Sequence, residues 1–154
     1  MSPAFNVYFV RPGASGNGSS WSNAWGNLSG INWGSLSAGS VVCIAGGSYS
    51  GSITTGASGD SGNPIVLKRA VASDPTCGST TAGWNSAYDA QVLMSGTISI
   101  QNSNVTIDGQ VDSGIRINFP NPPACTGSDI YCNNQSAIWI GGGSQLSPAV
   151  TSLN

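Results

Sequence analysis

The sequence predicts an all-β protein built as a parallel solenoid, and three observations support this prediction. Short apolar runs recur between turns rich in glycine, which is the pattern of short strands. Several runs are almost continuously apolar, as expected for strands that are buried by neighbours. The centres of two of them, Val42 and Val66, lie 24 residues apart, a distance that suits one turn of a repeat architecture.

The expected strands follow one another along most of the chain. The first covers residues 5–10 and stops at Arg11-Pro12-Gly13. The others are expected at residues 41–44, 52–55, 65–67, 92–94, 98–100, 105–107, 115–117 and 137–140. Glycine, asparagine, aspartate and proline at residues 59–64 predict a turn. Residues 119–123 cannot form a central strand, because their prolines cannot donate to a ladder of hydrogen bonds.

A tryptophan-rich stretch precedes these strands. Its large apolar residues are Trp25, Leu28, Ile31, Trp33 and Leu36, at spacings close to those of one helical face. Intervening glycines weaken a helix, so we expect one or two short helical turns that cover the end of the sheet stack.

The organisation that follows has three parts. Residues 1–39 form the N-terminal strand and capping segment, and residues 40–141 form the parallel coils, with loop excursions at 73–90 and 119–136. Residues 142–154 form a loose or truncated tail. Because one coil cannot bury its apolar face alone, we expect a longer solenoid or an open end covered by another chain.

Composition excludes several classes of protein. The chain has 154 residues and a net charge of −2, only 6% of its residues are charged, and it contains no histidine. Nucleic-acid binding needs clustered cations, and the only ones are Arg11, Lys68, Arg69 and Arg116. No apolar run approaches the roughly 18 residues of a membrane span. The first residues lack the charged and apolar regions of a signal peptide.

The four cysteines favour disulfides over a metal site. They are Cys43, Cys77, Cys125 and Cys132, with no Cys-x-x-Cys spacing and no histidine to complete a zinc site. Cys125 and Cys132 bracket a short loop that a disulfide would close, which leaves Cys43 to pair with Cys77. Four cysteines allow three connectivities, and four free buried thiols are the alternative. Disulfides would indicate an oxidising compartment.

The tryptophans allow two interpretations. Trp21, Trp25, Trp33 and Trp84 are candidates for an aromatic platform that binds sugar rings. Burial in the core is the commoner role of such residues, and we prefer it.

Several motifs together resemble the secreted right-handed parallel β-helix proteins of the pectate-lyase-like superfamily. Residues 8–14 and 16–21 read Tyr-Phe-Val-Arg-Pro-Gly-Ala and Gly-Asn-Gly-Ser-Ser-Trp, similar to the opening strand and glycine-rich loop of that family. Residues 36–49 resemble the next segment, with Ala38-Gly39-Ser40 in place of a Pro-Gly-Asp-type turn. Residues 61–67 and 104–109 match the coil strands that follow. The resemblance covers residues 7–118 and implies a right-handed parallel β-helix.

The family includes polysaccharide lyases, glycoside hydrolases, tailspikes, adhesins and structural surface proteins, so the fold does not fix the activity. In its lyases, acidic residues, often holding calcium, act with a lysine or arginine base. The weak catalytic candidates here are Lys68, Arg69, Asp108 and Arg116. A calcium ion would need at least two close carboxylates, and only Asp108 and Asp112 are near in sequence. The alternative, which we prefer, is that Asp108 accepts turn hydrogen bonds and the three cations are solvated.

Two hypotheses of function remain, and the sequence does not decide whether the protein is an enzyme. The first is a secreted, carbohydrate-associated β-helix protein with no complete catalytic site in this chain and no cofactor, calcium being implied by the resemblance alone. The second is a structural surface protein, such as an adhesin or a self-assembling filament subunit, whose partners are copies of itself. No serine, histidine and aspartate triad is possible without histidine.

Overall fold

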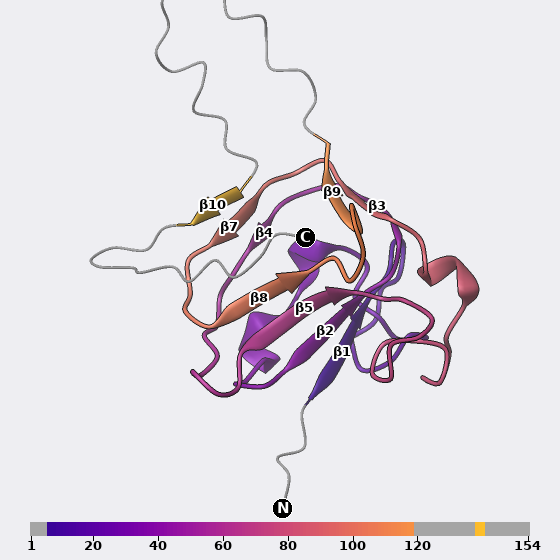
Figure 1. Cartoon of the computed structure of the whole chain (residues 1–154), viewed down its shortest axis with the longest axis horizontal. Helices are drawn as coiled ribbons and strands as arrows, with labels where there is room; N and C mark the ends of the chain where they lie inside the picture. Colours follow the sequence, from indigo (N-terminus) through magenta and orange to yellow (C-terminus); the bar gives the residue numbers. More distant parts are fainter. Residues whose placement is uncertain (1–5, 119–137, 141–154) are drawn as a thin grey trace, which may run out of the picture.

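Three parallel sheets make up the computed structural model, which describes residues 6–118 and, as backbone, residues 138–140 (Figure 1). Sheet A contains, in spatial order, β1 (Val7–Val10), β2 (Val41–Ile44), β5 (Ile65–Arg69) and β8 (Val105–Asp108). Sheet B contains β3 (Gly47–Tyr49), β6 (Val92–Met94) and β9 (Ile115–Ile117). Sheet C contains β4 (Ile53–Thr54), β7 (Ile98–Ile100) and β10 (Ile138–Ile140), with β7 in the middle.

The chain visits the three sheets in a repeating order. From β2 onward it passes from sheet A to sheet B, then to sheet C, and then returns to sheet A beside the strand it left. Every pair of neighbouring strands is parallel. A parallel pair needs a long crossover connection, and here the crossover consists of the strands of the other two sheets. The fold is therefore all-β, as the sequence predicts, and its sheets are parallel.

The strand predictions are confirmed with small differences at their ends. Strands β2, β6, β7 and β9 have the predicted bounds, whereas β5 and β8 extend beyond them and β4 is shorter. The predicted turn at residues 59–64 is present, and Asp60 and Asn63 exchange backbone hydrogen bonds there. β3 was not predicted, because Gly47-Ser48-Tyr49 contains no β-branched residue, whereas β4 contains Ile53 and Thr54.

The main core lies among the three sheets. It includes Val42 and Leu67 from sheet A, Val92 and Met94 from sheet B, and Ile98 from sheet C, all with side chains exposed by 3% or less. Alternate residues of a strand point to opposite faces, so each strand contributes every second residue to this core. Burial of such side chains is worth about 1.5–3 kcal/mol each and supplies the main stabilisation of the fold.

The tryptophan-rich segment contributes Trp25, Leu28, Ile31 and Leu36 to this core. It contains two short 3-10 helices, η1 (Leu28–Gly30) and η2 (Trp33–Ser35), each begun by an asparagine side chain that accepts a backbone hydrogen bond. Trp25 is 6% exposed and stacks on Tyr8, with ring centroids 5.2 Å apart. The segment also lies beside β1, where Val10 and Trp25 form a parallel bridge.

A second cluster covers the other face of sheet A. Phe9 and Cys43 are partners in the register of β1 and β2 and point away from the main core, against Trp21. Cys43 forms a disulfide with Cys77, the pairing preferred from the sequence. Because Cys77 belongs to the segment between β5 and β6, the disulfide fixes that excursion to the sheet. The excursion also contains a third 3-10 helix, η3 (Ser86–Tyr88), which was not predicted.

Some predictions fall outside the described residues. They are the pairing of Cys125 with Cys132, the excursion at 119–136 and the tail at 142–154. Within the described residues, no helix has the length and apolar character that crossing a membrane requires.

Candidate functional site

Lys68 and Arg69, two candidate catalytic cations, both take part in ion pairs that hold the excursion. Lys68 Nζ lies 2.7 Å from Asp74 Oδ2, and Arg69 Nη2 lies 2.8 Å from Asp89 Oδ1. Arg69 Nε also donates to the carbonyl oxygen of Ala90. Their side chains are only 15% and 7% exposed. The expectation that these two cations are solvated is therefore wrong, and their charge serves the attachment of the excursion.

Asp74 gives the excursion a fixed turn. Its Oδ1 accepts hydrogen bonds from the backbone N–H groups of Thr76 and Cys77, and its Oδ2 accepts from Lys68. Burial alone would raise the pKa of Asp74, but these hydrogen bonds and the charge of Lys68 outweigh it and hold the pKa below its usual value. The carboxylate is thus ionised and structural.

Asp108 lies at the end of β8, in register with Lys68 of β5. Its two carboxylate oxygens accept hydrogen bonds from the backbone and side-chain amides of Gln110, at 2.8 and 2.7 Å. This turn role is the one preferred from the sequence. No ion pair joins Asp108 to Lys68 among the described residues. Among the residues that the structure describes, there is no group of three histidine, cysteine or acidic side chains that could hold a metal ion.

The tryptophan candidates are mostly buried. Trp21 is fully buried within an aromatic cluster with Phe9, Trp84 and Tyr88, and its ring centroid lies 4.7 Å from that of Tyr88. Neither Trp21 nor Trp25 has a ring face available to a sugar, so the platform interpretation fails for these two. Trp84 remains half-buried on the excursion, with its ring edge-on to Trp21 and to Tyr88, and Trp33 is also half-buried.

Arg116, the last cationic candidate, lies apart from the others. It occupies the middle of β9 in sheet B, in register with Leu93 of β6, and its side chain is exposed. Lys68 and Asp108, by contrast, belong to sheet A. The structure therefore brings Lys68 and Asp108 to adjacent strands but places Arg116 on a different sheet.

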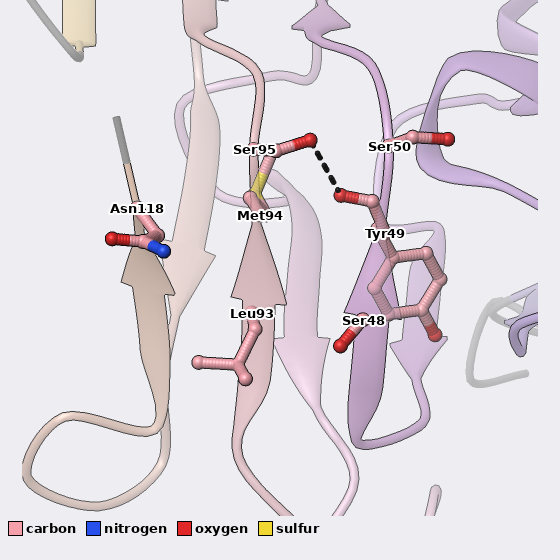
Figure 2. Close-up of a pocket in the computed structure, with 7 residues that line it drawn as sticks. All are labelled: Ser48, Tyr49, Ser50, Leu93, Met94, Ser95 and Asn118. Atoms are coloured by element: carbon pink, nitrogen blue, oxygen red, sulfur yellow. Dashed lines mark hydrogen bonds between the residues drawn. The ribbon is translucent and has the colours of Figure 1, made fainter. Parts of the chain in front are cut away.

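The surface of sheet B has a hollow of about 370 Å³, which we call the sheet B hollow (Figure 2). It is lined by Ser48, Tyr49, Ser50, Leu93, Met94, Ser95 and Asn118. Figure 2 shows these residues on three neighbouring segments: within β3 and β6, and just after the ends of β3, β6 and β9. Parallel strands that end together place their side chains in rows, which explains how residues so distant in sequence line one hollow.

The polar groups of the hollow are mostly uncharged hydroxyls and an amide. Ser95 Oγ lies 3.4 Å from the carbonyl oxygen of Tyr49, to which it donates, and Asn118 donates its backbone N–H to Met94. The hydroxyl of Tyr49 is turned to the interior, where it donates to the carbonyl oxygen of Ala45 at 2.7 Å. Its burial raises the pKa of Tyr49, so it stays neutral. The described residues of the lining therefore offer hydrogen bonds and include no ionised group.

Sequence reasoning missed this hollow. Its serines are ordinary members of a chain rich in serine, and the residues of β3 and β6 that face each other are 45 positions apart. The signal that could have indicated it is the alternation of serine at positions 48, 50 and 52, which is typical of the exposed face of a strand.

The chain was compared with models of known protein families, with curated proteins and with solved structures. None of the three comparisons gives a significant match. The function must therefore be argued from the residues and their arrangement.

Proposed function

We propose that the protein is a secreted, carbohydrate-associated right-handed parallel β-helix, with a saccharide chain bound on the outer face of sheet B. The proposed fold is supported by the repeated order in which the chain enters sheets A, B and C. The motifs at residues 8–21 and 36–49, which resemble those of the pectate-lyase-like superfamily, support it independently.

The observation that carries the proposed binding is the sheet B hollow. It combines exposed hydroxyls at Ser48, Ser50 and Ser95 with the amide of Asn118 and the half-buried apolar side chain of Leu93. Binding sites for small ligands combine apolar surface with a few polar groups that fix orientation. A sugar ring presents both hydroxyls and apolar C–H faces, so it matches this lining.

Binding without catalysis is the form of the proposal that fits the described residues. Lys68 and Arg69 are committed to ion pairs, and Asp108 is committed to its turn. General acid–base catalysis needs a group within hydrogen-bond reach of the reacting atom, and the lining residues that the structure describes include no carboxylate, lysine or arginine. Secretion is supported by the Cys43–Cys77 disulfide, since disulfides persist in oxidising compartments.

The experiment is a screen of the full chain against neutral and uronic-acid polysaccharides. Affinity electrophoresis measures binding, while absorbance of unsaturated ends and assay of reducing ends measure turnover. We expect retardation by at least one polysaccharide and no turnover. Absence of binding to every polymer in the panel would contradict the proposal, and turnover would place catalysis in this chain.

Self-assembly is a second candidate function, favoured by one observation. Among the described residues, β8 and β9 are the last strands of sheets A and B, and their side chains at Val105, Ile107, Ile115 and Ile117 are only half-buried against the core. Sheet edges with apolar side chains are templates for further pairing. Head-to-tail pairing would produce filaments, which electron microscopy and size exclusion at increasing concentration would detect. A monomer at all concentrations would exclude this candidate.

A further inference from the structure

The sheet B hollow continues into a longer row of hydroxyl groups. Strands β3 and β6 pair at an offset of 45 residues, and β4 and β7 pair at the same offset, so residues 47–54 lie alongside residues 92–99 throughout. Tyr49, Ile53, Met94 and Ile98 have buried side chains. Eight other positions of the two segments reach the surface: Ser48, Ser50, Thr54 and Ser95 are exposed, and Ser52, Leu93, Thr97 and Ser99 are half-buried.

Seven of these eight positions carry a hydroxyl group. The hydroxyl row consists of Ser48, Ser50, Ser52, Thr54, Ser95, Thr97 and Ser99, and the eighth position is Leu93. Within the row, Thr97 donates to the hydroxyl oxygen of Ser52 at 3.0 Å, which shows that the two segments remain in register between the sheets. The row thus continues the hydroxyl groups of the hollow along residues 48–54 and 95–99.

The charges near the row favour an uncharged ligand. A carboxylate is recognised best by cations, which form charge-assisted hydrogen bonds with it, and none of the described residues that line the hollow carries a positive charge. Arg116 is the one cation near the row: it pairs in register with Leu93, and its side chain is exposed. An exposed cation contributes only about 0–1 kcal/mol to an ion pair and is screened by salt. Hydroxyls, in contrast, both donate to and accept from the hydroxyls of a neutral sugar.

We infer that the sheet B hollow and the hydroxyl row bind an uncharged polysaccharide, with Leu93 against the apolar face of one sugar ring and serine hydroxyls bonded to sugar hydroxyls. This inference rests on the proposed carbohydrate binding and names its ligand class. It assigns Ser50 and Ser95 as binding residues and leaves Arg116 outside the recognition of the ligand.

The test compares four proteins and two classes of polymer. The proteins are the wild type, the double variant Ser50→Ala/Ser95→Ala, Arg116→Gln, and Ser103→Ala as a matched control at an exposed serine outside the row. The polymers are neutral glucans, xylans and mannans on one side and polygalacturonate and alginate on the other. Affinity electrophoresis at 50 and 500 mM salt gives the dissociation constants, and urea unfolding midpoints confirm that each variant is folded.

We expect a neutral polymer to bind with an affinity that changes less than about twofold with salt. Because a hydrogen bond contributes about 1 kcal/mol, the double variant should bind about tenfold or more weakly. Arg116→Gln and Ser103→Ala should bind the neutral polymer as the wild type does.

Three results would overturn the inference. Binding of the uronic-acid polymers alone, abolished in Arg116→Gln and weakened by salt, would retain the proposed carbohydrate function but reverse the ligand class. Binding of a neutral polymer with wild-type affinity by the folded double variant would place the site elsewhere. No binding of any polymer would overturn the inference together with the proposed function.

Discussion

Asp74 shows how a single carboxylate organises a long excursion. Three hydrogen bonds converge on its two oxygens, from Lys68 and from the backbone N–H groups of Thr76 and Cys77. The side chain is only 5% exposed, so its charge is stabilised by these partners and little by water. Lys68, a candidate catalytic residue from the sequence, is thereby fixed in a structural role.

This arrangement predicts a pH dependence of stability. The pKa of Asp74 is lower in the folded chain than in the unfolded one, where it is about 4. Its stabilising contribution is therefore fully present above about pH 4 and is lost as the pH falls through the folded value. Asp74→Asn should lower the free energy of unfolding at pH 7 by about 1–3 kcal/mol, and the gap from wild type should narrow toward pH 2.

Urea unfolding of both proteins between pH 2 and pH 7 measures this gap. Asp112→Asn is the control, because Asp112 is exposed and takes part in no ion pair among the described residues. A gap of constant size over the whole range would show that the charge of Asp74 is not the stabilising feature.

Gly96 is needed where two neighbouring segments approach each other most closely. A Cβ atom at this position would overlap the carbonyl oxygen of Gly51, between the strands of sheet B and those of sheet C. Since a backbone carbonyl cannot move aside without breaking the register, Gly96→Ala should destabilise the fold by about 1–3 kcal/mol. Gly62→Ala is the control, because a Cβ atom there would meet open space, and it should change the unfolding midpoint little. Equal effects of the two substitutions would contradict the close pairing of residues 47–54 with residues 92–99.

At the scale of elements, the excursion between β5 and β6 is attached to sheet A at three places. The Cys43–Cys77 disulfide, the Lys68–Asp74 pair and the Arg69–Asp89 pair each connect it to strands β2 or β5. The attachment places Trp84 and Tyr88 against Trp21 and thereby covers the outer face of the sheet.

Removal of the disulfide should therefore cost substantial stability. The cysteines are separated by 34 positions, and a disulfide that closes a loop of such length contributes about 2–4 kcal/mol. We expect the double variant Cys43→Ala/Cys77→Ala to show a fall of this size in urea unfolding, together with increased solvent exposure of Trp84 in fluorescence. An unchanged unfolding midpoint would show that the ion pairs alone hold the excursion.

How far the sequence predicts each strand depends on its β-branched and apolar residues. Strands such as β2 and β7 have at least two large apolar residues and were predicted at their observed bounds. β3 has one, Tyr49, and no β-branched residue, and was missed. The disulfide of Cys43 was preferred from the sequence, but the ion pairs of Lys68 and Arg69 were not, because their acidic partners lie in an excursion whose path the local pattern does not specify.

The sheet B hollow could not be predicted for a related reason. The pairing of β3, β6 and β9 requires the excursion between β5 and β6 to lie outside the sheets. Only then does Ser48 pair in register with Leu93, and Leu93 with Arg116. The spacing of 24 residues inferred from Val42 and Val66 is close to the register of β2 with β5, in which Val66 pairs with Val41 at an offset of 25 residues. It does not carry over to sheet B, where the offset between β3 and β6 is 45 residues.

At the scale of the whole molecule, the three sheets give two different outer surfaces. The outer face of sheet A is apolar at β1 and β2 and is covered by the aromatic cluster and the excursion. The outer face of sheets B and C carries the hydroxyl row and is exposed at Ser48, Ser50, Thr54 and Ser95. A surface so poor in charge depends on hydrogen bonding for recognition, which is the basis of the proposed binding of a neutral polysaccharide.

The most direct measurement is a titration of the isotopically labelled chain with a soluble neutral oligosaccharide taken from a polymer that binds, followed by amide chemical shifts. The account predicts that the largest shifts fall on the lining of the sheet B hollow, at Ser48–Ser50, Leu93–Ser95 and Asn118, and extend to Ser52 and Thr97. Shifts concentrated at Trp84 and Tyr88, or at the edge strand β8, with the hollow unchanged, would contradict it.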